Sequence, residues 1–196
     1  MNELISLSDL IPTKSTSNSI FCGTNIHISE VKDYGLIRVQ MFNRGTESID
    51  KILTKINIEL PSTGQTMFSK QNMTLWSAPG EWIVAVPSGS ELVEAERLTK
   101  SFADILHAVT IMSDSRVILK LKGPLIRQLL AKGSAVDFHP SVFTFGCCIT
   151  TKFAQIPVMI TQTSEDTDFF LFTDSSYACY LSEWLIDAAA EFEFTN

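Results

Sequence analysis

The stretch Leu129–Phe143, LLAKGSAVDFHPSVF, holds the end of a predicted helix and the start of an irregular segment. Gly133 is placed to end that helix, because glycine readily adopts the left-handed conformation found after many helices. Pro140 prevents a new helix from forming, since proline lacks an N–H donor. The segment is too polar for a core element, yet two ionisable groups, Asp137 and His139, stand among aromatic residues. We therefore expect a specific loop rather than a generic connection.

Strands and helices are predicted on both sides of this loop. Before it, Arg116–Lys122 alternates apolar and charged residues, as a half-buried strand does. Pro124 then suits the first turn of a helix, where its missing N–H costs nothing. After the loop, three β-rich runs predict strands, and apolar residues at helical spacing predict a closing helix. The strands are 147–154, 156–163 and 168–174, and the helix is marked by Tyr177, Leu181, Trp184, Leu185 and Ala188.

The first half of the chain shows the same order. A strand is predicted at Leu36–Phe42, and the runs MTLWSA and EWIVAVP flank the turn signal Pro79-Gly80, which predicts a hairpin. Ser88 with Glu91 fits a capping box at the start of a helix. The apolar positions of the two predicted helices are Ile49, Ile52, Leu53 and Ile56 for the first and Leu92, Ala95, Leu98, Phe102 and Ile105 for the second.

This repetition predicts an α+β fold that is internally duplicated. The strand–helix–strands–helix units, about 36–112 and 113–192, are expected to share one core. The junction ILHAVTIMSDS is strand-like and has no glycine or proline linker, so residues 31–196 are predicted to form a single domain. Residues 1–30 are rich in Ser, Thr and Asn, and they predict an irregular N-terminal arm.

Composition excludes several classes of function. The chain has 196 residues, a net charge of −7, 45% hydrophobic residues and 13 Phe. Such acidity disfavours nucleic-acid and membrane-surface roles. There is neither an apolar run of bilayer length nor a basic, apolar leader, so we expect a cytoplasmic protein. The apolar content fits either a well-filled core or surface that partner subunits cover.

Residues that suggest chemistry also have ordinary structural explanations. His27 and His107 have no metal-ligand spacing to other residues. Asp137 and His139 are compatible with an oriented base, but we favour an Asx-type turn that caps the loop backbone. Free buried thiols are expected for the cysteines, which lack a C-x-x-C pair: Cys22, Cys147, Cys148 and Cys179.

Two further features, a tryptophan pair and a serine-rich turn, also have both a functional and a structural interpretation. Trp76 and Trp82 are compatible with stacking on a ligand, but core or cross-strand contacts are favoured. Ser113, Asp114 and Ser115 are better explained as turn residues than as a nucleophile site, because no G-x-S-x-G is present. Gly-rich phosphate-binding motifs are also absent from the sequence. We therefore predict no catalytic, cofactor-binding or metal-binding residue in this chain.

Five blocks in order, between about Met73 and Phe192, resemble gamma subunits of heterotetrameric sarcosine oxidase. They are LWSAPGEWIVAVP, SDSRVILKLKGP, LLAKGSAVDFHPSVF, CCITTKFAQIPVMI and SEWLIDAAAEF. The resemblance gives a hairpin signature, which is Trp76, Pro79, Glu81 and Trp82. It gives a loop signature, structural or at an interface, which is Gly133, Asp137, His139, Pro140 and Phe143. The sequence departs from the family at Ser134, where a cysteine is usual, and at Asp174-Ser175, where Arg-Ser is usual.

The resemblance implies a fold like the tetrahydrofolate-binding domain of aminomethyltransferase. It implies assembly with alpha, beta and delta subunits, which would hold FAD, FMN, NAD, tetrahydrofolate and zinc. Such a complex oxidatively demethylates sarcosine to glycine and passes the one-carbon unit to tetrahydrofolate. The resemblance places no catalytic or flavin-linking residue in the gamma chain, so we expect a non-catalytic subunit.

Two alternative functions remain. One is a stand-alone folate-binding protein of the aminomethyltransferase superfamily, although the K-G-C-x-x-G-Q-E type motif of that branch is replaced here by FTFGCCITT. The other is a subunit of a related dehydrogenase that acts on another N-methyl amino acid. The sequence does not separate this last alternative from sarcosine oxidase, because a partner would select the substrate.

Overall fold

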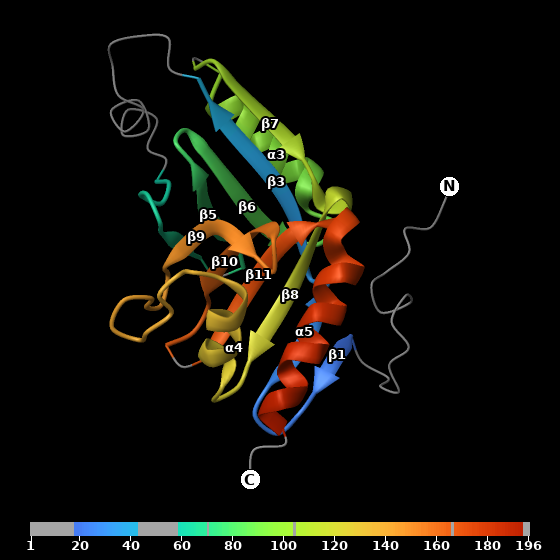
Figure 1. Ribbon diagram of the computed structural model, residues 1–196. Helices are drawn as coiled ribbons and strands as arrows, with labels where there is room; N and C mark the ends of the chain where they lie inside the picture. The colour runs from blue at the N-terminus through green and yellow to red at the C-terminus, as the bar shows by residue number, and fades with distance from the viewer. Residues whose placement is uncertain (1–17, 43–58, 70, 104, 166, 194–196) are drawn as a thin grey trace. The chain divides into compact units, whose positions relative to one another are not determined.

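The computed structural model (Figure 1) describes residues 18–42, 59–69, 71–103, 105–165 and 167–193. The chain forms two compact units, Lys32–Ser113 and Met1–Val31 with Asp114–Asn196. The division after Ser113 coincides with the predicted boundary between the half-repeats. The short helix predicted from Ile49, Ile52, Leu53 and Ile56 lies outside the described residues.

The unit Lys32–Ser113 contains an antiparallel sheet of five strands in the order β4-β5-β6-β3-β7. The predicted hairpin is confirmed, because β5 and β6 pair on either side of Pro79-Gly80. Gly80 has a φ of 74°, a conformation that glycine adopts without strain. The elements are β3 Tyr34–Met41, β4 Thr66–Phe68, β5 Met73–Ala78, β6 Glu81–Pro87, α3 Glu91–Ser101 and β7 His107–Ile111.

The start of α3 differs from the prediction, and the capping box of Ser88 and Glu91 is wrong. Gly89 has a φ of 87°, and the Ser90 amide donates to the Pro87 carbonyl at 3.0 Å, so a turn precedes the helix. Ser90 occupies the N-cap position without a side-chain capping bond. The Glu91 carboxylate is used elsewhere, because it accepts a hydrogen bond from Ser113 Oγ at 3.2 Å.

Only part of the predicted apolar face of α3 is buried. Leu98 and Phe102 pack with alternate residues of β3 and β6, including Val39 and Val84. Leu92, at the other end of the helix, is 63% exposed. The helical spacing therefore predicted the helix correctly but not the extent of its burial.

The unit of residues 1–31 and 114–196 contains an antiparallel sheet of six strands in the order β1-β2-β8-β11-β10-β9. Its elements are β1 Ser19–Cys22, β2 His27–Val31, η1 Ser113–Ser115 at its boundary, β8 Arg116–Lys122, α4 Ile126–Gly133, β9 Cys148–Phe153, β10 Ile156–Gln162, β11 Asp168–Asp174, η2 Ser175–Tyr177 and α5 Ala178–Glu193. The predicted strands and closing helix of the second half are confirmed, while α4 begins after Pro124 rather than at it.

The structure of residues 19–31 differs from the predicted irregular arm. Residues 19–22 and 27–31 form β1 and β2, and β2 pairs with β8 along its length. Ile26 and Ile28 are buried although the surrounding sequence is polar. The arm prediction is therefore wrong for these residues, and residues 1–17 lie outside the described part of the chain.

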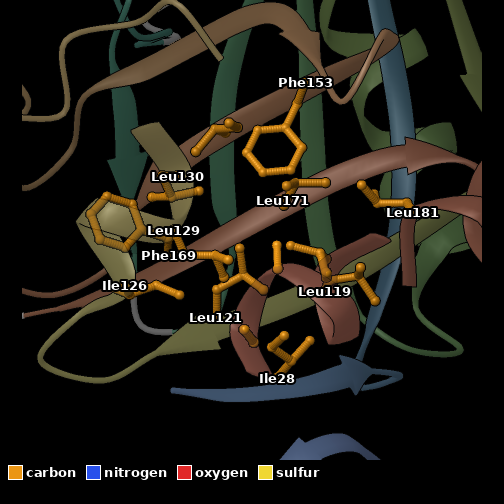
Figure 2. Close-up of a cluster of buried hydrophobic side chains, with 14 of the residues drawn as sticks. Ile28, Leu119, Leu121, Ile126, Leu129, Leu130, Phe153, Phe169, Leu171 and Leu181 are labelled. Carbon is orange, nitrogen blue, oxygen red and sulfur yellow. The ribbon is translucent and has the colours of Figure 1, made fainter. Parts of the chain in front are cut away.

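One face of the six-stranded sheet packs against α4 and α5. Alternate residues of β8 and β11 point to the same side, so their apolar side chains gather into one layer. Figure 2 shows these side chains converging with those of the helices. Burial of each such side chain contributes about 1.5–3 kcal/mol to folding. The labelled members are Ile28, Leu119, Leu121, Ile126, Leu129, Leu130, Phe153, Phe169, Leu171 and Leu181.

Gly133 ends α4, as predicted, but for a different reason. It is not among the residues with a positive φ, and the following Ser134 is extended. A Cβ atom at Gly133 would overlap the ring of Phe153. That ring packs edge-on against Trp184 of α5 at 5.1 Å between centroids, which limits its ability to move aside. The position therefore needs glycine for space.

The two sheets share a strand order. The order β4-β5-β6-β3-β7 corresponds to β9-β10-β11-β8-β2, and a helix follows β6 just as α5 follows β11. The sixth strand, β1, pairs with the outer edge of β2. Among the described residues, β7 has no such outer strand.

The Gly133 contact gives a testable expectation. Gly133→Ala should lower the free energy of unfolding by about 1–3 kcal/mol, because the added methyl group overpacks the site. Chemical denaturation of the purified protein measures this change. Ala131→Ser, at an exposed position of the same helix, is the control. Equal stability of Gly133→Ala and wild type would contradict this account of the helix end.

Candidate functional site

The loop between α4 and β9 is held in place by Arg127, a residue of α4. Its Nη1 donates to the Phe138 carbonyl at 2.6 Å and to the Phe143 carbonyl at 3.0 Å. Its Nη2 donates to Gln162 Oε1 at 3.0 Å. One guanidinium thus satisfies two loop carbonyls that no strand or helix pairs with. The sequence analysis missed this residue, because a single arginine in an amphipathic helix carries no distinguishing signal.

Aromatic side chains also hold this loop in place, through apolar contacts. Phe138 and Phe143 are buried, with ring centroids 5.2 Å apart, and both contact Phe169 of β11. The Arg127 guanidinium carbon lies 5.1 Å from the centre of the Phe169 ring, a cation–π arrangement. Burial lowers the pKa of Arg127 from its ordinary value. The loop signature residue Phe143 therefore belongs to the core of its unit.

The predicted Asx-type turn is confirmed. Asp137 Oδ1 accepts a hydrogen bond from the His139 amide at 2.9 Å. His139 Nδ1 accepts from the Ser141 amide at 3.2 Å and contacts Ser141 Oγ at 2.7 Å. The Asp137 carboxylate is thus not bonded to the imidazole. These bonds cap the backbone before and after Pro140, and the arrangement does not form an Asp–His catalytic pair.

Two large apolar side chains are exposed at the tip of this loop, next to the exposed polar residues Ser141 and Thr144. Val142 is 57% exposed and Phe145 is 46% exposed. The Val142 and Phe143 amides both donate to the His139 carbonyl at 2.9 Å, which fixes the turn that carries them. The loop therefore presents apolar side chains from a backbone that is hydrogen-bonded at its base. This arrangement is suited to contact with another protein surface.

The hairpin signature forms structural contacts. Trp82 is buried, it pairs with Trp76 across the hairpin, and its Nε1 donates to the Pro61 carbonyl at 3.0 Å. The carboxylate of Glu81 accepts from Gln40 Nε2 at 2.8 Å and from Ser77 Oγ at 2.9 Å. Pro79 stands in the exposed turn. The favoured interpretation of the tryptophans as core and cross-strand residues is confirmed.

A shallow cleft of about 330 Å³ lies beside the loop that joins β1 and β2. Within that loop the amides of Thr24, Asn25 and Ile26 donate to the Glu193 carboxylate at 2.6, 3.0 and 3.2 Å. These amides, which could bind an anion, are therefore occupied by the carboxylate of Glu193 at the end of α5. Asp168, on the other side of the cleft, pairs with Lys120 at 2.9 Å.

His27 of β2 lines this cleft rather than lying in an irregular arm. Burial lowers the pKa of His27, and the nearby charges of Lys122 and Lys120 lower it further. His107 begins β7, as predicted, and its Nδ1 lies 2.8 Å from the Ile105 carbonyl. No group of three or more His, Cys, Asp or Glu side chains in the described residues suits a metal ion.

The described cysteines are free, but the prediction that they are buried holds only for Cys148. Cys147 and Cys179 are partly exposed, and Cys22 is exposed because it ends the outer strand β1. Ser113 forms a turn, as predicted, and its Oγ accepts from the Leu36 amide at 2.9 Å. Where the sequence departs from the family, Ser134 Oγ accepts from the Val136 amide at 3.3 Å, and Asp174 pairs with Arg116 at 3.0 Å.

No helix among the described residues has both the length and the apolar character that crossing a bilayer requires.

Known structures first define the class of fold. Aminomethyltransferase T of the glycine cleavage system from Bartonella henselae matches with a TM-score of 0.61 and 16% identity, over 84% of this chain and 46% of that one. Heterotetrameric sarcosine oxidase from Corynebacterium sp. U-96 contains a chain that matches with a TM-score of 0.77 and 23% identity, over 91% of each chain. The expected α+β, aminomethyltransferase-like fold is confirmed.

Sequence similarity then defines the family. The model of the sarcosine oxidase, gamma subunit family matches residues 48–191, and the chain belongs to this family. A sarcosine oxidase subunit gamma from Corynebacterium sp. (strain P-1) is 35% identical over 118 residues. That alignment spans 60% of this chain and 57% of the relative.

The Arg127 anchor predicts a large effect of one substitution. Arg127→Ala should lower the free energy of unfolding by about 2–3 kcal/mol, because two part-buried carbonyls lose a charged donor. Thermal or urea unfolding measures the loss. Arg97→Ala is a matched control, since Arg97 is exposed and pairs with Glu94 of the same helix. It should cost about 0.3–0.5 kcal/mol. Similar effects of the two variants would contradict the anchoring role.

His27 predicts a pH dependence of stability. Its folded-state pKa lies below the ordinary histidine value of 6.5, so the unfolded chain binds more protons between the two values. The stability that depends on His27 is therefore complete above pH 6.5 and is lost as the pH falls towards the folded-state pKa. Denaturation at several pH values should show a weaker acid loss in His27→Gln than in wild type. Parallel curves would contradict the assignment.

Proposed function

We propose that this chain is a non-catalytic gamma subunit of a sarcosine-oxidase-type complex. The observation that carries the proposal is the family match over residues 48–191. The fold match to a chain of heterotetrameric sarcosine oxidase, which spans 91% of both chains, supports it.

In this proposal the chain acts with alpha, beta and delta subunits in the cytoplasm. The complex oxidises the N-methyl group of sarcosine, its flavins accept the electrons, tetrahydrofolate takes the one-carbon unit, and glycine is released. FAD, FMN, NAD, tetrahydrofolate and zinc would be held by the partners. This chain would contribute structure and contact surface.

The geometry of the loop supports a structural role. One carboxylate oxygen of Asp137 and one ring nitrogen of His139 are bonded to the loop backbone. The part-buried guanidinium of Arg127 is occupied by loop carbonyls and by Gln162. The loop also exposes two large apolar side chains, Val142 and Phe145. We propose that this loop tip is part of a contact with a partner subunit.

We also propose that residues 31–196, together with the strands formed by residues 19–31, form one duplicated domain with a shared core. The matching strand orders of the two sheets support this interpretation.

Co-expression with the three partner subunits tests the proposal. The chain should co-purify with them, while the chain alone should show no flavin absorbance and no sarcosine turnover. Val142→Lys should weaken co-purification, and Ala131→Lys, at an exposed position of α4, should not. Flavin absorbance or turnover in the isolated chain would contradict the proposal. A chain that binds tetrahydrofolate and ignores the partners would favour the stand-alone folate-binding alternative.

A further inference from the structure

Exposed apolar side chains are concentrated at one edge of the five-stranded sheet. Nine large hydrophobic residues are exposed in the described part of the chain, and five of them belong to α3, to β7 or to the residues that flank β7 and β3. Leu92 is 63% exposed and Ile111 is 44% exposed. The five residues are Phe42, Leu92, Val93, Leu106 and Ile111.

A groove of about 460 Å³ runs between α3 and β7 at this edge. Leu92, Ala95, Glu96, Thr99 and Lys100 line it from the helix, and Val109, Thr110 and Ile111 line it from the strand. The Thr99 hydroxyl is already satisfied, because it donates to the Ala95 carbonyl at 2.8 Å. The apolar members of this lining suit aliphatic side chains.

The backbone of β7 presents unused hydrogen-bonding groups along the same groove. The Phe42 amide donates to the Leu106 carbonyl and the Met112 amide donates to the Leu36 carbonyl, so alternate residues from 106 to 112 pair with β3. In an antiparallel pair the residues between them point their N–H and C=O groups away from the partner strand. These residues are His107, Val109 and Ile111, and β7 is the last strand on its side of the sheet in the described structure.

In the other unit, the corresponding sheet edge is paired with an additional strand. There β2 lies beside β8 as β7 lies beside β3, and β1 pairs with the outer edge of β2. The corresponding edge of β7 carries no strand in the described part of the chain. An open edge with apolar side chains is an aggregation hazard unless something covers it.

We propose that the groove between α3 and β7 is a strand-addition site for a partner subunit of the complex. The occupant is an extended segment with aliphatic residues at alternate positions, which pairs with the outward groups of His107, Val109 and Ile111 and places its side chains against Leu92. Main-chain hydrogen bonds supply affinity in this mode, and the alternate side chains supply specificity. This inference rests on the proposed function.

Charge favours a different chain over a second copy as the occupant. Each copy carries a net charge of −7. Two chains that each carry this net negative charge repel one another, which opposes self-association.

Hydrogen–deuterium exchange on the full chain, alone and assembled with the alpha, beta and delta subunits, tests the site. The amides of Val109 and Ile111 should exchange at least tenfold more slowly in the complex. Leu92→Lys should weaken co-purification at least tenfold. Val93→Lys is the matched control, because Val93 is the adjacent residue, is 73% exposed and does not line the groove.

The outcomes separate the two proposals. If the wild-type complex forms without protection of β7, and Leu92→Lys assembles normally, the strand-addition site is refuted and the proposed function stands. If wild type forms no complex, the proposed function fails and the site fails with it. Protection already present in the isolated chain would mean that a second copy or a segment of the same chain covers the edge, and it would also overturn the proposal. Measuring the mass of the isolated chain in solution distinguishes those two occupants.

Discussion

The hydrogen bonds of one guanidinium group allow an irregular loop to complete the core of its unit. The loop between α4 and β9 inserts Phe138 and Phe143 beside Phe169, at positions where no strand pairs with its backbone. Arg127 resolves this conflict, because its planar donors reach the carbonyls of both inserted residues from the adjacent helix. An ammonium group lacks that planar array of donors, so lysine would not be an equivalent replacement.

The sequence predicted the elements whose signals are local. The Pro79-Gly80 turn and the alternation in Arg116–Lys122 gave strand bounds that agree with the structure. Features that depend on contacts between distant residues were not predicted from the sequence. The polar segment at residues 19–31 becomes strand only because β8 offers it an edge, and the role of Arg127 depends on carbonyls 11 and 16 residues away. Gly133 was correctly placed at the helix end, but its cause is the ring of Phe153, which no local pattern reveals.

The candidate site also has one feature that the local sequence predicts and one that it does not. The Asx-type turn at Asp137 was predictable, since its partner is two residues away. The open edge of β7 was not, because strand order decides which strand is outermost. Both features lead to one view of the chain. Its ionisable loop groups serve the fold, whereas its exposed apolar groups, at the loop tip and along the α3–β7 groove, are available to other chains. This distribution supports the proposed role in assembly.

Native mass spectrometry of the purified complex tests that claim most directly. We predict a particle that contains one copy of this chain with the alpha, beta and delta subunits. On dissociation in the gas phase, this chain should leave with the mass of its polypeptide alone, while the flavins, dinucleotide, folate and zinc remain with the other subunits. A flavin or folate adduct that departs with this chain, or an intact complex that assembles without it, would contradict the account.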